Sequence, residues 1–274
     1  SDIKVYLPTR RAKRGLQDSF LRLSEGRARL LPIIESIGDA DLEEASFALE
    51  GAEEIPPAID PMQRQIVLAR FLEKAWPHNY HFQQAMVVAA ELGGLIDQIH
   101  TENLDIRDLE NVLVDRELSQ HWEITTNFLS LILGDIWPRY LESQGLIDPG
   151  LHRVKRIKML TEYYLVNAPE RPVIVAGSTG SLPATSQFIK TIAGLDQGHV
   201  VLPAIDTIMD DKAWFSVGEG HPQYLLKNLL KKCNVDRHDV QILGDNRNKD
   251  RQFLISEIMR PAIKTEEWQS LNND

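Results

Sequence analysis

The hydrophobic positions of this chain form short continuous runs near both ends and a helical period in the middle. The continuous apolar runs lie at residues 3–7, 173–177, 200–203 and 240–243. Runs of this length without polar alternation are typical of strands that are covered on both faces, as in a parallel sheet. Helical patterns alternate with the runs, and the last three of them span residues 184–195, 221–232 and 251–259. This alternation predicts an α/β fold built on a parallel sheet.

Between the first and second of these runs the apolar positions recur with the 3.6-residue period of a helix. The predicted helices span residues 61–76, 80–100, 104–113, 122–141 and 149–166. Before them we expect a short extended segment at residues 30–34, a turn at 37–39 and an acidic connector with a short helix at 39–57. We therefore predict a discontinuous parallel-sheet domain from residues 1–30 and 167–274. A mainly helical subdomain at residues 31–166 would be inserted into it.

Composition excludes several classes of protein. A single cysteine, Cys233, among 274 residues excludes a disulfide framework and a cysteine-based zinc or iron–sulfur site within the chain. There is no apolar segment of about 18 residues and no signal-peptide pattern, so we expect no membrane partner and a cytoplasmic location. The chain starts without Met at the edge of a strand, and we expect it to be a piece of a longer protein.

Charge is distributed unevenly along the chain. The formal net charge of −10 argues by itself against a nucleic-acid-binding protein. Residues 1–30, however, hold eight Lys or Arg and three Asp or Glu, whereas residues 35–60 hold nine acids and no Lys or Arg. The sequence therefore predicts basic spots on an acidic body.

The strongest candidate site follows the first apolar run. Pro8 and Thr9 end the run, and a helix then begins with cations in its first turns, among them Arg10, Arg11 and Arg14. Free N–H groups of a first helical turn bind phosphate, and Thr9 can add a hydroxyl. Cations at a helix N-terminus oppose the macrodipole, which favours a role toward an anionic ligand. A solvated basic helix face is the alternative.

Two further segments are candidate anion sites. The loop after the second run, Gly177-Ser178-Thr179-Gly180-Ser181, lies between a strand and a helix and could cradle a phosphate. It lacks the Lys of a Walker A loop, and a tight turn alone would explain its glycines. Arg153 and Arg156 point away from the apolar stripe of the helix at 149–166, so phosphate contact and plain solvation both remain open.

Other residues with chemical potential have simpler interpretations. Asp206, Asp210 and Asp211 follow a strand end and could bind a metal ion, but scattered loop acids are usually solvated, and we predict no metal site. His221 precedes a helix and is interpreted as part of its start. The tryptophans on apolar helix faces are interpreted as core residues; they are Trp76, Trp122 and Trp137.

Several motifs together resemble a known family. Residues 5–12, Val-Tyr-Leu-Pro-Thr-Arg-Arg-Ala, resemble a motif with which superfamily I helicases contact single-stranded DNA. Residues 173–185, 200–206, 209–211 and 221–224 resemble, in order and spacing, the AddB subunits of bacterial AddAB helicase–nucleases. The likeness is to the alphaproteobacterial type, an inactivated superfamily I helicase, and spans nearly the whole chain.

The resemblance implies a degenerate, P-loop NTPase-like RecA fold with an all-helical insert. It implies binding of single-stranded or duplex-end DNA in double-strand-break repair, with an AddA-type helicase–nuclease as partner. In that family such a helicase fold can also serve recombination-hotspot recognition. Active helicases carry a DExx acid where this chain has Ala176-Gly177-Ser178. A Walker A motif would precede residue 1, so ATP and Mg²⁺ are expected only if that motif is intact.

Two rival interpretations stay open. In the first, the chain is a working nucleotide hydrolase or transferase that uses residues 177–181 as its phosphate loop. In the second, it is a scaffold that docks a partner subunit through the helical block without touching DNA.

Overall fold

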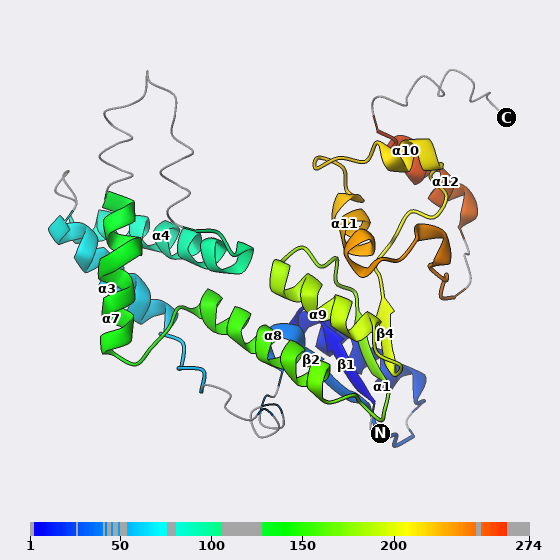
Figure 1. The fold of residues 1–274 in the computed structure, drawn as a ribbon, viewed down its shortest axis with the longest axis horizontal. Coiled ribbons are helices and arrows are strands. Elements are labelled where there is room, and N and C mark those ends of the chain that lie inside the picture. The colour runs from blue at the N-terminus through cyan, green and yellow to red at the C-terminus, as the bar shows by residue number, and fades with distance from the viewer. Residues whose placement is uncertain are drawn as a thin grey trace. The chain divides into compact units, whose positions relative to one another are not determined.

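The computed structural model describes residues 3–25, 27–40, 42, 45, 49, 54–75, 81–105, 128–244 and 248–261. The chain divides into two compact units, which are described separately (Figure 1). The first unit comprises Ser1–Ile37, Asn167–Ser181 and Thr185–Asp274, and the second comprises Gly38–Val166 with Leu182–Ala184.

The first unit is built on a four-stranded sheet in which every pairing is parallel. Its strands are β1 (Lys4–Leu7), β2 (Ile33–Ser36), β3 (Val173–Ala176) and β4 (Gly198–Val201). Their order is β2-β1-β3-β4, so β1 and β3 are central neighbours. The predicted α/β class with a parallel sheet is confirmed.

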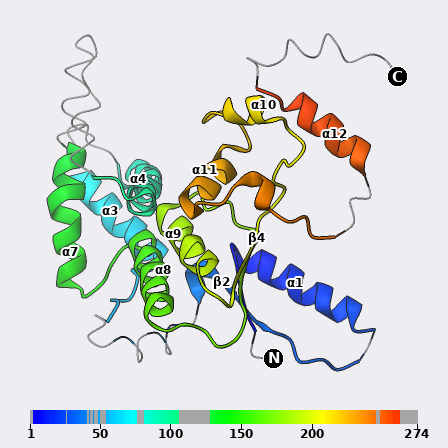
Figure 2. The same cartoon turned by 45° about the vertical axis from the view of Figure 1, so that its right-hand side comes forward.

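One helix packs on each face of this sheet (Figure 2). Helix α1 (Arg10–Leu23) packs Leu16 and Phe20 against Val5 and Leu7 of β1. Tyr6 points to the opposite face, because side chains alternate along a strand. There its ring meets Phe188 of α9 (Pro183–Ala193) edge-on, with ring centres 5.3 Å apart. Burial on both faces explains why β1 has no polar alternation.

The expected strand at residues 240–243 is wrong. This segment forms no strand in the structure, and Ile242 and Leu243 are 64% and 74% exposed. The fourth strand is β2, which the sequence assigned to the start of the helical insert as a short extended segment. Backbone pairing with β1 makes Ile33–Ser36 a strand, and its Ile34 is buried under α1. The hydrophobicity of a segment does not by itself predict which segment pairs with the free edge of a sheet.

The rest of the first unit consists of helices and the loops that connect them, where the structure describes it. It contains α10 (Asp211–Phe215), a short 3₁₀ helix at Arg237–Asp239 and α12 (Lys249–Ile258). It also contains α11 (Tyr224–Cys233), which buries Leu226, Leu229 and Leu230. Helices were predicted close to α11 and α12, and both predictions are confirmed. Within the described part of the chain, every helix is too short or too polar to cross a membrane.

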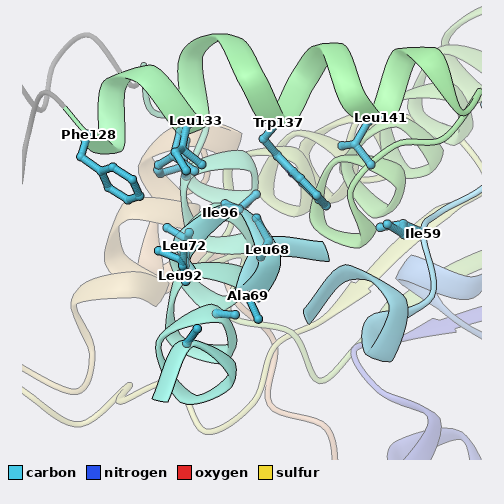
Figure 3. Packing of buried hydrophobic residues seen from close by; sticks show 14 residues of the cluster. Ile59, Leu68, Ala69, Leu72, Leu92, Ile96, Phe128, Leu133, Trp137 and Leu141 are labelled. Carbon is cyan, nitrogen blue, oxygen red and sulfur yellow. The ribbon is translucent and has the colours of Figure 1, made fainter. Parts of the chain in front are cut away.

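The second unit is a helical bundle with its own core (Figure 3). It contains α3 (Pro61–Ala75), α4 (Phe82–Glu102), a π-helical turn at Ile132–Ile136, α7 (Trp137–Ser143) and α8 (Pro149–Val166). A short 3₁₀ helix at Ile37–Asp39 leads into it. Trp137 is 2% exposed, which confirms its predicted core role. Trp76, Trp122, most of the predicted helix at 104–113 and most of the acidic connector lie outside the described residues.

A buried charge network joins three segments of this bundle. Both guanidinium nitrogens of Arg64 donate to Asp97, each at 2.8 Å. Asp148 lies beside them, is 2% exposed, and accepts the indole N–H of Trp137 at 2.9 Å. These hydrogen bonds raise the pKa of Arg64 and keep its charge paired. The network fixes α3, α4 and the start of α8 to one another.

Candidate nucleic-acid interface

The candidate interface lies at the carboxyl edge of the sheet, where the two central strands end. The chain leaves β1 through α1 toward β2 and leaves β3 through α9 toward β4, so the connections diverge from neighbouring strands. Ligands of open parallel sheets bind at such a topological switch point. The turn after β1 and the loop after β3 are in contact there, because a Cβ built on Gly177 would lie 3.8 Å from Cδ of Pro8.

Thr9 forms the N-cap of α1. Its backbone is extended, with φ −143° and ψ 156°, and its Oγ1 accepts the N–H of Ala12 at 3.1 Å. A capping hydroxyl accepts with its oxygen and keeps its own proton for another acceptor. Thr9 is exposed, so this hydroxyl can still donate to a phosphate, as the sequence predicted.

The predicted arginines lie on the first turns of the same helix. Arg10, Arg11 and Arg14 are exposed, and the first turn of α1 contains no acidic residue. Arg10 also interacts elsewhere within the chain. Arg11 and Arg14 form no ion pair with any residue that the structure describes. Their charge is therefore available at the helix end nearest the switch point, although it opposes the helix dipole.

The glycines of the loop at residues 177–181 are required by the backbone. Gly177 and Gly180 have φ values of +74° and +62°. A Cβ on Gly180 would lie 2.9 Å from Cδ1 of Leu229, so the buried side chain of Leu229 would have to move. The hydroxyl of Ser178 accepts the N–H of Gly180 at 3.2 Å. The loop is therefore a tight turn packed on α11, while Thr179 and Ser181 remain polar groups at the strand end.

Arg153 and Arg156 lie on α8, in the second unit. The side chain of Arg153 covers Gly38, where a Cβ would lie 2.5 Å from the arginine Nε. Arg156 donates to the backbone carbonyl of Ala40. Both arginines therefore hold residues 38–40 against α8, a structural role that the sequence left open. The structure does not bring them together with Thr9 in one unit.

Two of the three aspartates at residues 206–211 serve the local backbone, and the third, Asp211, pairs with the side chain of Arg237. Asp206 accepts the N–H groups of Ile208 and Met209, each at 2.9 Å. Asp210 caps α10 by accepting the N–H of Ala213, and this bond lowers its pKa, with the charge of Arg260 adding to the effect. The described residues contain no group of three potential metal ligands. These bonds explain the aspartates without a metal ion.

His221 joins two segments of the first unit. Its Nδ1 accepts the N–H of Gln223 at 3.0 Å, just before α11 begins at Tyr224. Its Nε2 lies 2.5 Å from the carbonyl oxygen of Met259 and must carry the proton. The predicted role at a helix start is confirmed.

The chain matches no protein-family model and no curated protein. Its function must therefore be argued from the residues and their arrangement.

One cluster of aromatic and charged side chains was not predicted from the sequence. Trp214 of α10 and one face of α11 line a common groove with Arg237 and His238. The signal was present as Tyr224, Lys227 and Lys231, which recur at helical spacing. The role of Arg237 could not be predicted from the sequence, because the residues that it contacts, Met209 and Asp211, lie in a distant earlier segment.

Proposed function

We propose that this chain is the RecA-like, helicase-related part of an AddB-type subunit. It binds and guides single-stranded DNA beside an AddA-type motor in the cytoplasm during the repair of double-strand breaks. It does not itself hydrolyse ATP, because Ala176-Gly177-Ser178 stand at the end of β3, where such enzymes need a carboxylate to hold Mg²⁺.

The observation that carries this proposal is the basic helix start at the switch point. Arg11 and Arg14, which form no ion pair with a described residue, lie on the first turns of α1 beside the carboxyl ends of the two central strands, and Thr9 caps the same helix end. Phosphate contacts supply most of the affinity for a nucleic-acid backbone. The chain as a whole is acidic, with a net charge of −10, which disfavours binding elsewhere and so directs a strand to this edge.

The test is fluorescence anisotropy of labelled oligo-dT with the full chain over a series of salt concentrations. The variant Arg11→Ala/Arg14→Ala should bind more weakly and with a shallower dependence on salt. Each lost contact with a single strand lowers the slope of log K against log salt by about 0.7, so the double variant should lose up to about 1.4. Arg10 is left in place because it also interacts within the chain.

The matched control is Arg22→Ala in the last turn of the same helix. It removes a cation from α1 but not from the strand edge, and it should leave the slope unchanged. Equal slopes for all three proteins would overturn the proposal and favour the docking scaffold. A nucleotide hydrolase would instead require measurable turnover of ATP by the chain, which we expect to be absent.

A further inference from the structure

A polar groove lies on the first unit between α10, α11 and the segment 235–238. Its volume is about 470 Å³, which falls within the usual range for small-ligand sites. One wall is formed by Trp214 and Val217, the second by α11, and the third by Arg237 and His238. All of these residues belong to one compact unit, so the groove is complete within it.

Helix α11 presents mainly polar side chains to this groove. Tyr224, Lys227, Asn228 and Lys231 line it and follow the i, i+3, i+4, i+7 spacing of one helical face. Three leucines of α11 are buried, Leu226, Leu229 and Leu230, and of these Leu230 also lines the groove. Besides this leucine, α11 offers the groove one aromatic ring, one amide and two ammonium groups.

The two lysines of this face repel each other. Lys227 and Lys231 are four residues apart on the helix, a spacing at which like charges destabilise. Burial lowers the pKa of Lys227, and the charge of Lys231 lowers it further. Neither lysine forms an ion pair with a described residue; the Nζ of Lys227 donates instead to the carbonyl oxygens of Phe215 and Val217, at 2.8 and 3.0 Å. An anion in the groove would relieve the repulsion.

The acids of the groove are already engaged. Asp211 accepts from Arg237 at 2.6 Å and lies 2.9 Å from Nε2 of His238. Asp236 caps the 3₁₀ helix by accepting the N–H of His238 at 2.8 Å. The lining therefore holds three cations, Lys227, Lys231 and Arg237, against the two carboxylates of Asp211 and Asp236, and one positive charge remains with neutral His238.

Aromatic rings stand beside these cations. The guanidinium carbon of Arg237 lies 4.9 Å from the centre of the Trp214 ring and holds that ring in place. Arg237 is itself fixed, since it also donates to the carbonyl oxygen of Met209 at 2.5 Å. Phe215 is 85% exposed next to the groove. Cations interleaved with aromatic rings are the usual means of holding a base and its phosphate.

We infer that this groove binds a nucleoside phosphate, with the phosphate at Lys227 and Lys231 and the base against Trp214 or Tyr224. The ligand can come from two sources that share this chemistry, a free nucleotide or one nucleotide of a single strand. The inference rests on the groove alone and holds whether or not the basic start of α1 binds DNA.

The test measures binding of dTMP, thymidine and inorganic phosphate to the full chain by calorimetry, and of oligo-dT by anisotropy. The test variant is Lys231→Glu, an exposed position with no described partner. The matched control is Lys212→Glu on α10, which changes the net charge equally but does not line the groove. Lys231→Glu should weaken dTMP binding about tenfold, while Lys212→Glu should leave it nearly unchanged.

The outcomes separate the two sources. Binding of dTMP that depends on Lys231 supports a free nucleotide as ligand. Lys231-dependent binding of oligo-dT without binding of dTMP supports a nucleotide within a strand. Three results would each overturn the inference. The two charge reversals could have equal effects, dTMP and inorganic phosphate could bind with equal affinity, or no probe could bind. Arg11→Ala/Arg14→Ala should not change dTMP binding, so failure of the proposed function remains distinguishable.

Discussion

Tyr6 of β1 and Val175 of β3 are register partners in neighbouring parallel strands, although the whole helical unit lies between them in the sequence. This pairing aligns the ends of the two strands, so the turn at Pro8 meets the loop at Gly177. The basic start of α1 and the polar loop before α9 therefore share one edge of the sheet. The following predictions test what holds this edge and the neighbouring groove in place.

Replacing Thr9 separates stability from binding. Thr9→Ala removes the hydroxyl that accepts from Ala12, and it should cost about 1 kcal/mol of unfolding free energy. Thr9→Asp keeps a capping oxygen and adds a charge that the helix dipole favours, so stability should be retained. The same carboxylate should repel phosphate and weaken binding of oligo-dT.

Urea unfolding and anisotropy on the same samples measure both effects. If Thr9→Asp bound oligo-dT as tightly as the unchanged protein, the strand would not pass this helix end.

Two glycine substitutions should act in opposite directions. Gly180→Ala places a Cβ at φ +62° and 2.9 Å from Leu229, and it should destabilise the first unit by about 2 kcal/mol. Gly94→Ala lies on the exposed side of α4 with nothing within 4 Å of the added carbon. It should stabilise the second unit by about 0.5–1 kcal/mol, because alanine favours a helix.

Thermal unfolding followed by circular dichroism measures both variants. Equal melting temperatures for the two would show that the loop at 177–181 adjusts freely, contrary to a tight turn.

Acid should destabilise the cap of α10. The pKa of Asp210 is lowered in the folded state by the Ala213 N–H and by Arg260. A carboxyl with a depressed folded pKa adds stability above its unfolded pKa of about 3.9, and that stability is lost as the pH falls through the folded value. Asp210→Asn still caps but does not titrate.

The unfolding free energy of the Asp210→Asn variant should therefore fall less steeply below about pH 4 than that of the unchanged protein. Urea titrations from neutral to acid pH provide the comparison, and parallel curves for the two proteins would contradict the assigned cause.

Helix α8 illustrates what local pattern predicts well. The sequence placed a helix at residues 149–166, and α8 has these bounds. Proline in the first turn starts it, and three residues of its predicted apolar stripe, Val154, Ile157 and Leu160, are buried, whereas the fourth, Leu151, is half-buried. The same pattern could not assign Arg153 and Arg156, because their neighbours, Gly38 and Ala40, come from a distant segment.

The strands were predicted less well than the helices. Residues 240–243 are as apolar as a strand, yet they lie outside the sheet with Leu243 exposed. Ile33–Ser36 are less distinctive and form β2, because the edge of β1 is available to them after the short crossover through α1. Strand formation requires a partner edge, and the identity of that partner is not encoded locally.

The sequence by itself determined the α/β class, most helices that the structure describes, and the basic, Thr-capped start of α1. These features follow from short-range periodicity, capping and charge, which act within a few residues. Only the tertiary structure decided the strand order, the meeting of the Pro8 turn with the Gly177 loop, and the groove in which Arg237 holds Trp214. Each of these joins segments far apart in the chain, and such contacts depend on packing and hydrogen-bond partners that no local pattern specifies.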